Sequence, residues 1–521
     1  MISNEKRNAL FVRGDIFMYE DRIRYAALRD RIITADEAAT LIKDGMTVGI
    51  SGFTRAGDAK EVPLALAQRV KRTGEKVKIN LWTGASVAEE VDRALTEAGC
   101  LARRLPYQSE KLLRDAINRG EVMYVDQHLS LTVEMVRDGQ LGKLDVAVIE
   151  AVAITEDGNI IPSTSVGNSP TFVKMADKVI VELNIGQPAA LEGMHDVFIP
   201  GDRPDREPIP ILEVNDRIGT TYISVDPDKI AGVVITNKLD HFSAIAPVDE
   251  ETEAIANHLL NFFEDEILAG RMDDKLRPLQ SGIGSVANAV LSGLKKSRFK
   301  GLEMYSEVLQ DSVFELIDAG TLRFASGCSI TLSPARAQEV LDRIAEYRDA
   351  IVLRPQEISN SPGLVRRLGL IAMNTAIEVD IYGNVNSTHV MGTRMMNGIG
   401  GSGDFARNAS VTIFVTKSTA KGGAISSIVP MASHVDHTEH DVDIIVTEQG
   451  LADLRGLAPR ERAQVIIKNC AHPMYRDALM DYYQEAVTLG GHTPHVLDKA
   501  LSWHSRYLKE GTMRLPVHEL S

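Results

Sequence analysis

The chain is poor in cysteine and aromatic residues, and it lacks a long apolar run. Its 521 residues include three cysteines, Cys100, Cys328 and Cys470, which lie far apart. This spacing indicates neither a disulfide framework nor a metal-binding cysteine motif, and it fits a reducing compartment. No apolar run approaches the roughly 18 residues of a membrane span, and the N-terminus shows no apolar core of a secretory signal. We therefore expect a cytoplasmic protein, or a mitochondrial one if the source is eukaryotic.

Basic residues are fewer than acidic ones. The chain has 57 Lys and Arg against 72 Asp and Glu, which gives a net charge of −15. This balance argues against general binding of nucleic acid or of an anionic membrane. A ligand-sensing transcription regulator would also need a basic DNA-binding segment. An anionic small molecule can still bind where lysine, arginine or backbone N–H groups converge locally.

Short β-rich runs alternate with helical patterns through most of the chain. Strands are expected at 46–50, 77–82, 122–124, 146–150, 178–183 and 230–235, with helices at 61–70, 87–97 and 110–118 between them. In the second half a helix is expected at 251–269, a glycine loop that runs into a helix at 281–293, and the start of a further helix at 313–318. Strands are expected at 303–305, 376–382, 411–416 and 443–447, and the C-terminal part is expected to be helical. This alternation predicts an α/β architecture with largely parallel sheets. We expect two domains, 1–240 and 241–521, with a ligand site between them.

A glycine-rich loop, Gly398–Gly403, is the most unusual local feature of the sequence. Its four glycines match the pattern G-x-G-x-x-G, which in dinucleotide-binding proteins lies between a strand and a long helix. Residues 394–397 are not expected to form a strand, the next strand begins near 411, and no acidic residue occurs between Asp404 and Asp436. A dinucleotide site is therefore the weaker hypothesis. A loop whose backbone N–H groups close on an anionic oxygen, or a plain turn, remains.

A second glycine loop precedes the helix that is expected near residue 285. Gly282 and Gly284 stand before Ser285, and a helix N-terminus offers backbone N–H groups to phosphate or an oxyanion. The alternative is an ordinary helix start that Ser285 caps. The segment 51–63 poses the same question, because it either shapes a substrate pocket or simply joins a strand to a helix with Pro63 in its first turn.

Two carboxylates, Glu307 and Asp311, follow the expected strand 303–305. Strand ends of this kind are where open α/β sheets bind ligands. An ionised carboxylate there needs no activating base to attack a carbonyl. Taken alone, either residue is at least as well explained as a negative charge near a helix start.

Three histidines, His434, His437 and His440, crowd into seven residues and raise the question of a metal site. The spacing does not place all three on one helix face, and the H-E-x-x-H pattern is absent. A metal-dependent hydrolase is thus the weaker reading. The segment is better explained as a polar loop that ties neighbouring elements together by hydrogen bonds.

Taken together, these motifs resemble the acetyl-CoA hydrolase/transferase branch of the class I coenzyme A transferases. The matching segments are 51–63, 279–290, 306–312, 366–383, 386–409, 426–457 and 470–475. The resemblance implies two tandem domains of the NagB/RpiA/CoA-transferase type, usually as a homodimer. It also implies that the N-terminal domain holds the acyl or carboxylate pocket and that the C-terminal domain holds the nucleophile and the coenzyme A site.

The same resemblance assigns roles to individual residues. Glu307 becomes the nucleophile, Gly401 an oxyanion-hole donor and Asn360 a polar group that orients the acyl carbonyl. The implied coenzyme A contacts are Gly282, Ile283, Gly284, Ser285, Val286, Asn397, Gly401 and Lys421. No metal and no tightly bound cofactor are expected, since coenzyme A is both a substrate and part of a covalent intermediate.

The expected reaction moves coenzyme A between a short-chain acyl-CoA and a small carboxylate such as acetate, succinate or propionate. It would proceed through an acyl-glutamyl anhydride and a glutamyl–CoA thioester on Glu307. An acetyl-CoA hydrolase would use the same first intermediate with water as the acceptor. Exclusion of water separates the two outcomes, and the sequence does not reveal it.

Overall fold

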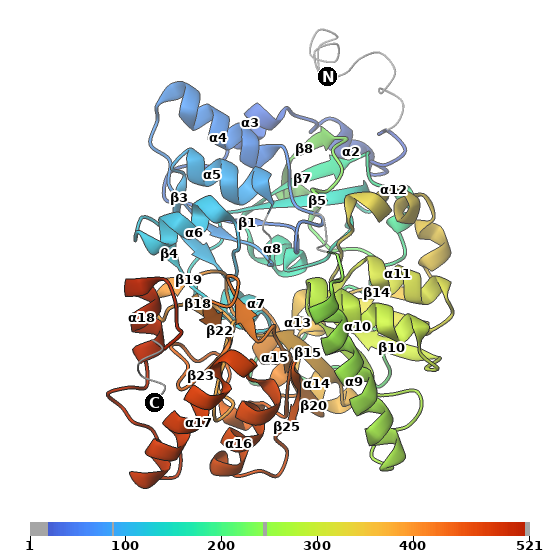
Figure 1. Cartoon of the computed structure of the whole chain (residues 1–521). Coiled ribbons are helices and arrows are strands. Elements are labelled where there is room, and N and C mark those ends of the chain that lie inside the picture. Colours follow the sequence, from blue (N-terminus) through green and yellow to red (C-terminus); the bar gives the residue numbers. More distant parts are fainter. Residues whose placement is uncertain (1–18, 86–87, 243–246, 516–521) are drawn as a thin grey trace. The chain divides into compact units, whose positions relative to one another are not determined.

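The computed structural model describes residues 19–85, 88–242 and 247–515 (Figure 1). The described residues form two compact units. Those within Met1–Ala244, Tyr305–Phe314 and Phe324–Leu364 belong to unit 1, and those within Ile245–Met304, Glu315–Arg323 and Val365–Ser521 belong to unit 2. Two stretches beyond residue 240 thus belong with the N-terminal segment. The division into domains 1–240 and 241–521 stays a prediction.

Unit 1 contains a largely parallel sheet with the strand order β4-β3-β2-β1-β5-β7-β8. The strands are β4 (Met123–Tyr124), β3 (Leu101–Leu105), β2 (Ile79–Trp82), β1 (Thr47–Ile50), β5 (Val146–Ile154), β7 (Lys178–Asn184) and β8 (Ile230–Thr236). A short antiparallel strand, β6 (Ile160–Pro162), pairs with β5. The strands expected in this half of the chain are confirmed, because runs of β-branched residues buried on both faces mark parallel strands clearly.

Successive residues of β1 point to opposite faces of this sheet, and helices cover both faces. Val48 and Ile50 join the core that the sheet forms with α3 (Ala35–Ala39), α4 (Val62–Thr73), α5 (Ala94–Glu97) and α6 (Lys111–Asn118). Gly49 points the other way, since a Cβ there would meet Phe172 of α8 (Ser169–Met175) at 2.8 Å. Helices therefore cover both faces. The helix expected from residue 87 begins outside the described residues, and its described part starts with a π-helical turn, Glu89–Arg93.

The later segments form two pairs of parallel strands among themselves. β11 (Val308–Leu309) pairs with β13 (Ser329–Ile330), and β12 (Leu322–Gly327) pairs with β14 (Ile351–Leu353). β13 also binds the N-terminal segment, because Val166 N donates to Cys328 O at 3.1 Å and Ile330 N donates to Thr164 O at 2.9 Å. Helix α11 (Asp311–Asp318) follows β11, and α13 (Gln356–Ser359) follows β14.

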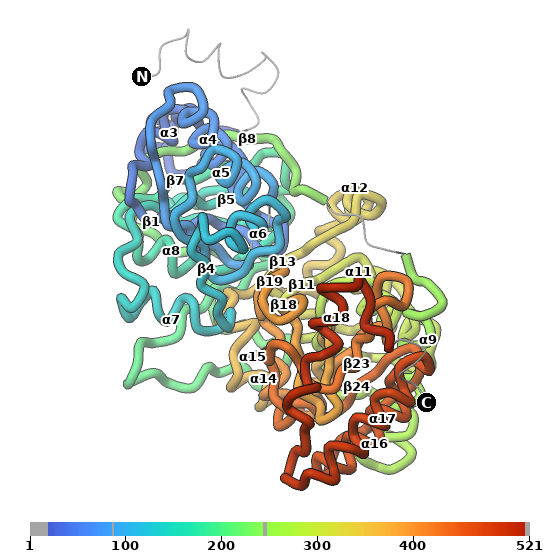
Figure 2. Tube along the Cα trace, turned by 60° about the vertical axis from the view of Figure 1, so that its left-hand side comes forward, coloured from blue at the N-terminus to red at the C-terminus, as the bar shows by residue number. Residues whose placement is uncertain are grey.

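In unit 2 the strands β10 (Leu302–Tyr305), β9 (Leu279–Ser281), β15 (Ile371–Thr375), β20 (Val411–Val415), β24 (Ile444–Thr447) and β25 (Gly450–Asp453) follow one another in this order. β25 is antiparallel to β24, and the other neighbours are parallel. Helices α9 (Glu250–Leu268) and α10 (Ser285–Lys296) pack closely, since a Cβ at Gly293 would lie 2.9 Å from Leu260. The C-terminal helices α16 (Pro459–Cys470) and α17 (Pro473–Thr488) lie side by side (Figure 2).

Two expectations for unit 2 need correction. The strand expected at 376–382 is present only in its middle, as β16 (Glu378–Asp380), which pairs with β17 (Val385–Asn386) and β23 (Ile428–Val429), and the preceding strand β15 was not expected. The apolar pattern runs through both strands and hides the break. Residues 394–397 were expected not to form a strand, yet Arg394–Met395 is β19, which pairs with β18 (His389–Val390) in a small hairpin. Among the described residues, no helix has the length and apolar character needed to cross a membrane.

Candidate functional site

Glu307 lies in unit 1, in the short connection between β10 and β11. Its carbonyl oxygen accepts hydrogen bonds from the N–H groups of Cys328 at 2.6 Å and Ser329 at 3.1 Å. The preceding Ser306 N donates to Ser326 O at 2.9 Å. The main chain is therefore held on both sides of Glu307, while its side chain stays partly exposed.

The side chain of Glu307 is held by Asn360. Asn360 Nδ2 donates to Glu307 Oε1 at 2.6 Å, and the Asn360 side chain is completely buried. The predicted pair is thus brought together although 53 residues separate the two in sequence. In this structure the amide contacts the carboxylate itself, and its contact with an acyl carbonyl remains a prediction.

Asn360 owes its position to α13, which it terminates. Arg137 forms two hydrogen bonds to the buried carboxylate of Glu357, at 2.9 and 2.8 Å. Gln356 Nε2 donates to Leu129 O at 3.0 Å, and Tyr305 Oη donates to Ile358 O at 2.5 Å. A helix of four residues has little stability of its own. These contacts from three other segments fix it, and with it the amide that holds Glu307.

The segment 51–57 packs against the strands that flank Glu307. Phe53 shares a small apolar cluster with Val308 of β11 and with Cys328. Thr54 Oγ1 lies 2.8 Å from Thr331 Oγ1, and Thr331 Oγ1 donates to Thr54 O at 3.1 Å. Thr54 and Arg55 have φ values of 50° and 68°, a left-handed conformation that is uncommon outside glycine. Two consecutive strained residues are a feature that sequence reasoning did not detect, and such strain is typical of functional sites.

The residues that follow, 60–63, form the N-terminus of α4, and a side chain of the protein caps it. Glu182 accepts the backbone N–H groups of Lys60 at 2.6 Å, Glu61 at 3.0 Å and Val62 at 2.7 Å, and Pro63 lies in the first turn of α4. A buried carboxylate therefore occupies the N-terminus of α4, where an anionic ligand could otherwise bind. Lys60 Nζ donates to Asp240 Oδ1 at 2.9 Å, and it also bonds to Glu150.

Two other groups near Glu307 are not candidates for the nucleophile. Asp311, at the start of α11, accepts hydrogen bonds from the backbone N of Ser333, at 2.9 Å, and from the Ser333 hydroxyl, so it has the structural role weighed for it. Burial raises the pKa of the Cys328 thiol well above its ordinary value, and the negative charge of Glu307 adds to this. Cys328 is therefore a protonated, buried thiol, and the thiol form is a poor nucleophile.

In unit 2 the segment 282–286 comprises the loop 282–284, which joins β9 to α10, and the first two residues of α10. Gly282 N donates to Met373 O at 3.0 Å, and Gly284, with φ 126°, is the N-cap residue. Ser285 is the first helical residue and not the cap, and the cap residue Gly284 has no side chain that could cap the first turn. Ile283 is 48% exposed, whereas Val286 is buried. The alternative of a helix start capped by Ser285 is therefore wrong.

The loop 398–403 lies between the β18–β19 hairpin and α15 (Ser402–Ala406). Gly400 has φ 60°, and Gly401, with φ −88° and ψ −4°, is the N-cap residue of this five-residue helix. The short helix agrees with the rejection of a dinucleotide fold here. Asn397 is partly exposed, and its Oδ1 is buried with no hydrogen-bond partner among the described residues. Its amide oxygen is thus suited to accept a ligand donor.

Lys421 is exposed in the turn between β21 (Thr419–Ala420) and β22 (Ile425–Ser426), with φ 52°. The turn is anchored nearby, because Tyr475 Oη donates to Gly423 O at 2.8 Å. Lys421 is thus a cation on a held turn. Its predicted contact with coenzyme A remains a prediction.

The three clustered histidines point to different partners. His434 Nε2 lies 3.2 Å from Asp436 Oδ1, His437 Nε2 lies 3.0 Å from Ser402 Oγ, and His440 is exposed. Across residues 19–85, 88–242 and 247–515, no three His, Cys, Asp or Glu side chains gather as metal ligands would. The segment connects β17, the β18–β19 hairpin and α15, as the polar-loop reading predicted.

Comparison with known proteins identifies the family. The model of the acetyl-CoA hydrolase/transferase N-terminal domain matches residues 18–235, and that of the C-terminal domain matches residues 337–483. The chain belongs to the acetyl-CoA hydrolase/transferase family. It is 54% identical to a succinyl-CoA:acetate CoA-transferase from Clostridium kluyveri over 95% of this chain and 92% of the relative. It is 44% identical to an acetyl-CoA hydrolase from Kluyveromyces lactis over 96% of this chain and 98% of the relative.

The fold of the family is also recovered. A 4-hydroxybutyrate CoA-transferase from Porphyromonas gingivalis superimposes with a TM-score of 0.61 over 90% of this chain and 99% of its own, at 21% identity. The predicted α/β fold of the CoA-transferase type is thereby confirmed. The comparisons establish an enzyme of this family, and the roles of Glu307, Asn360, Gly401 and the predicted coenzyme A contacts remain predictions.

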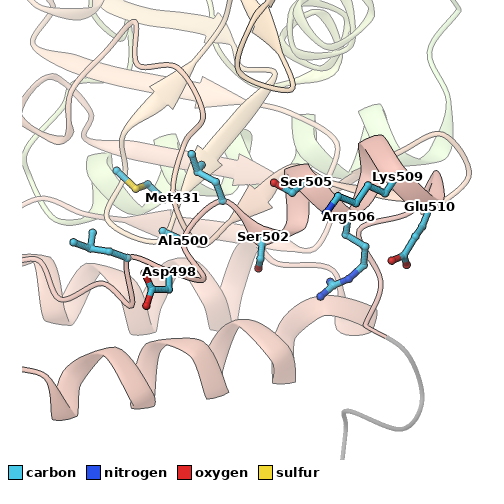
Figure 3. A pocket seen from close by; sticks show the side chains of 10 residues that line it. Met431, Asp498, Ala500, Ser502, Ser505, Arg506, Lys509 and Glu510 are labelled. Atoms are coloured by element: carbon cyan, nitrogen blue, oxygen red, sulfur yellow. The ribbon is translucent and has the colours of Figure 1, made fainter.

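A cavity of about 460 Å³ opens beside α18 (Ser502–Glu510) (Figure 3). Its lining includes Met431, Asp498, Arg506 and Lys509. The residues predicted for catalysis or coenzyme A binding are not among those that line it. This cavity is therefore separate from the predicted site of the family reaction.

Proposed function

We propose that this chain is a CoA-transferase that moves coenzyme A between a short-chain acyl-CoA and a small carboxylate. The donors would be succinyl-CoA, acetyl-CoA or propionyl-CoA, and the acceptor a carboxylate such as acetate. The 54% identity to a succinyl-CoA:acetate CoA-transferase supports the substrate class. The observation that carries the mechanism is the partly exposed carboxylate of Glu307, held at 2.6 Å by the buried amide of Asn360.

The first half of the reaction would activate Glu307. One carboxylate oxygen attacks the thioester carbonyl carbon, and the C–S bond breaks as coenzyme A leaves as a thiolate. The product is a mixed anhydride between the acyl group and Glu307. A carboxylate is a weak nucleophile, so alignment must supply much of the rate, and alignment can contribute about 7–11 kcal/mol. The bond from Asn360 restricts the rotation of the carboxylate before the substrate arrives.

The second half would exchange the carboxylates. The coenzyme A thiolate attacks the glutamyl carbonyl, which releases the donor's carboxylate and leaves a Glu307–CoA thioester. The acceptor carboxylate attacks that thioester, so that a new anhydride forms and the thiolate leaves again. The thiolate then attacks the acyl carbonyl, which forms the new acyl-CoA and restores the Glu307 carboxylate. No proton is gained or lost over the cycle.

Unit 2 would supply the groups that bind coenzyme A and stabilise developing charge. We propose that the N–H of Gly401 stabilises the oxyanion of the tetrahedral intermediates, a role worth about 3–4 kcal/mol in comparable enzymes. The segment 282–286, Asn397 and Lys421 would bind coenzyme A. The glycine at the N-cap of α10 and the buried Oδ1 of Asn397 support this assignment. An acidic chain thus offers an anionic ligand local donors in place of net positive charge.

The decisive test is the mass of the intact protein after incubation with acetyl-CoA and no acceptor. A coenzyme A-sized increment should appear on the peptide that contains Glu307, and Glu307→Ala should show neither the increment nor transferase activity. Glu303→Ala is the matched control, because Glu303 is an acidic residue of the neighbouring strand that pairs with Arg323. Transferase activity in Glu307→Ala at the wild-type level would overturn the assignment.

The alternative function is an acetyl-CoA hydrolase, which the Kluyveromyces lactis relative favours. Both enzymes form the same acyl-enzyme, and water or a carboxylate decides the product. A panel of acetate, succinate, propionate, butyrate and water with one acyl-CoA separates them. Transfer to a carboxylate at least tenfold faster than hydrolysis supports the transferase, and the reverse ratio supports the hydrolase. A homodimer is also proposed, and light scattering of the purified protein tests it.

A further inference from the structure

His437 makes a hydrogen bond that reaches into the 398–403 loop. Its Nε2 lies 3.0 Å from Ser402 Oγ, and Ser402 Oγ lies 2.7 Å from Ile399 O. A carbonyl oxygen can only accept, so the single hydroxyl proton of Ser402 points to Ile399. The imidazole must therefore donate its Nε2–H to the hydroxyl. The result is a directed chain, from imidazole to hydroxyl to carbonyl, that spans the turn containing Gly400 and Gly401.

His437 is itself rigidly placed. Its backbone exchanges two hydrogen bonds with Val385, at 2.8 and 3.1 Å, and its side chain is 2% exposed. The ring lies against Phe414 of β20, with centroids 4.7 Å apart. Phe414 is completely buried in a core strand of unit 2. The imidazole thus transmits the position of that strand to the loop.

The composition of the loop gives it little intrinsic preference for one shape. Four glycines in six residues give it large conformational freedom in the unfolded chain and weak intrinsic preference in the folded one. Gly401 offers no side chain to cap α15, and that helix has five residues. Oxyanion donors work only when their geometry is fixed before the reaction. A loop of this composition therefore needs an external brace to serve as one.

We propose that His437 is a positioning residue that holds the N–H of Gly401 in place through Ser402. This inference rests on the proposed oxyanion role of Gly401. His437 touches neither the acyl group nor coenzyme A in this proposal, and it takes no proton during the reaction. Its contribution is the fixed orientation of the turn, so the loss should appear in turnover and not in substrate affinity.

The test compares four variants with the wild-type enzyme in steady-state transfer from acetyl-CoA to succinate. His437→Leu removes the donor and Ser402→Ala removes the bridging hydroxyl, and each should lower kcat about 10- to 100-fold with KM for acetyl-CoA changed less than threefold. The double variant should be no slower than the slower single variant, because both changes break one chain of bonds. His437→Gln, which restores an N–H donor, should have a kcat at least threefold higher than that of His437→Leu.

His434→Gln is the matched control. His434 lies in the same segment, but it bonds to Asp436 and stacks on His389 with ring centroids 3.8 Å apart. Its replacement should leave kcat within twofold. Equal losses in His434→Gln and His437→Leu, or a wild-type kcat in Ser402→Ala, would overturn the proposal. If His437→Leu does not fold, the result for Ser402→Ala decides, since it removes one oxygen atom from a partly exposed side chain.

Intact-protein mass separates this inference from the proposed function. If the brace acts as stated, the His437 and Ser402 variants still accumulate the coenzyme A adduct on Glu307, but more slowly than the wild type. Absence of the adduct in the wild type would instead refute the glutamyl mechanism. An adduct that forms at the wild-type rate in both variants would refute the brace and leave the mechanism standing.

Discussion

Replacement of Asn360 by alanine should slow the acylation of Glu307 strongly. The bond between Asn360 Nδ2 and Glu307 Oε1 is 2.6 Å long, and its donor is completely buried. A hydrogen bond to a charged group contributes about 1.5–3 kcal/mol. If that energy orients the carboxylate for attack, its loss slows acylation about 10- to 150-fold, at tenfold per 1.36 kcal/mol. A carboxylate relieved of the bond becomes slightly more basic, which works in the opposite direction but does not restore its orientation.

The assay is single-turnover formation of the enzyme–CoA adduct, quenched with acid and weighed as intact protein. Ser361→Ala is the control, because Ser361 is the next residue and its hydroxyl can be removed without a change in the backbone. Asn360→Asp separates hydrogen bonding from packing. It keeps the shape but places a like charge beside Glu307, which raises the pKa of that group, so acylation in this variant should accelerate as pH rises. Acylation of a stably folded Asn360→Ala at the wild-type rate would refute the reasoning.

Three further predictions concern unit 2. Gly401→Val should lower kcat more than it lowers coenzyme A affinity. The φ of −88° at Gly401 tolerates a side chain, so the effect must come from the space that the valine side chain occupies at the loop. An unchanged kcat would contradict the oxyanion role. Gly400→Ala should cost about 1–2 kcal/mol of unfolding free energy, measured in urea, because its φ of 60° is left-handed. Burial acts to raise the pKa of Glu378, but its hydrogen bonds, led by that from His504 at 2.8 Å, outweigh burial and lower it. A carboxyl whose pKa is lower in the folded state than in the unfolded chain, where it is about 4.5, stabilises the fold at pH values above 4.5. This stabilisation is lost as the pH falls through the folded-state pKa. The urea midpoint of the wild type should therefore drop between about pH 5 and 3, and that of Glu378→Gln should drop less.

The parts of the fold that could be predicted are those whose strands are buried on both faces. β5 and β7 carry runs of valine and isoleucine that no amphipathic helix would show, and they were found within a few residues. β9 has three residues beside a glycine loop and was hidden by the helix signal that follows. β15 and β16 share one apolar run, and only their pairing with different partners separates them. That pairing depends on tertiary structure, which no local pattern encodes.

Some features of the candidate site could also be predicted from the sequence, and others could not. A carboxylate after a strand could be located from the sequence, but spacing alone did not distinguish Glu307 from Asp311. The family resemblance singled out Glu307, and the structure gives Asp311 a partner in Ser333. Glu307 and Asn360 were each singled out by the family resemblance and not by spacing, and their contact was not expected, because they lie 53 positions apart in the sequence. Hydrogen bonds from the histidine segment were expected in general terms, but the specific bond from His437 to Ser402 was not identified. A histidine cluster near a helix start is the weak signal that could have indicated it.

The two helix starts of the glycine-containing loops show why composition alone could not locate an anion site. α4 and α10 both follow a strand and a turn, and each has twelve residues with similar terminal dipoles. The chain closes the first with its own buried carboxylate, Glu182, which accepts three backbone N–H groups. It gives the second only Gly284, which has no side chain to compete with a ligand. A chain with a net charge of −15 thus closes one helix start with a carboxylate and leaves the other to a glycine, and its composition alone does not show which is which.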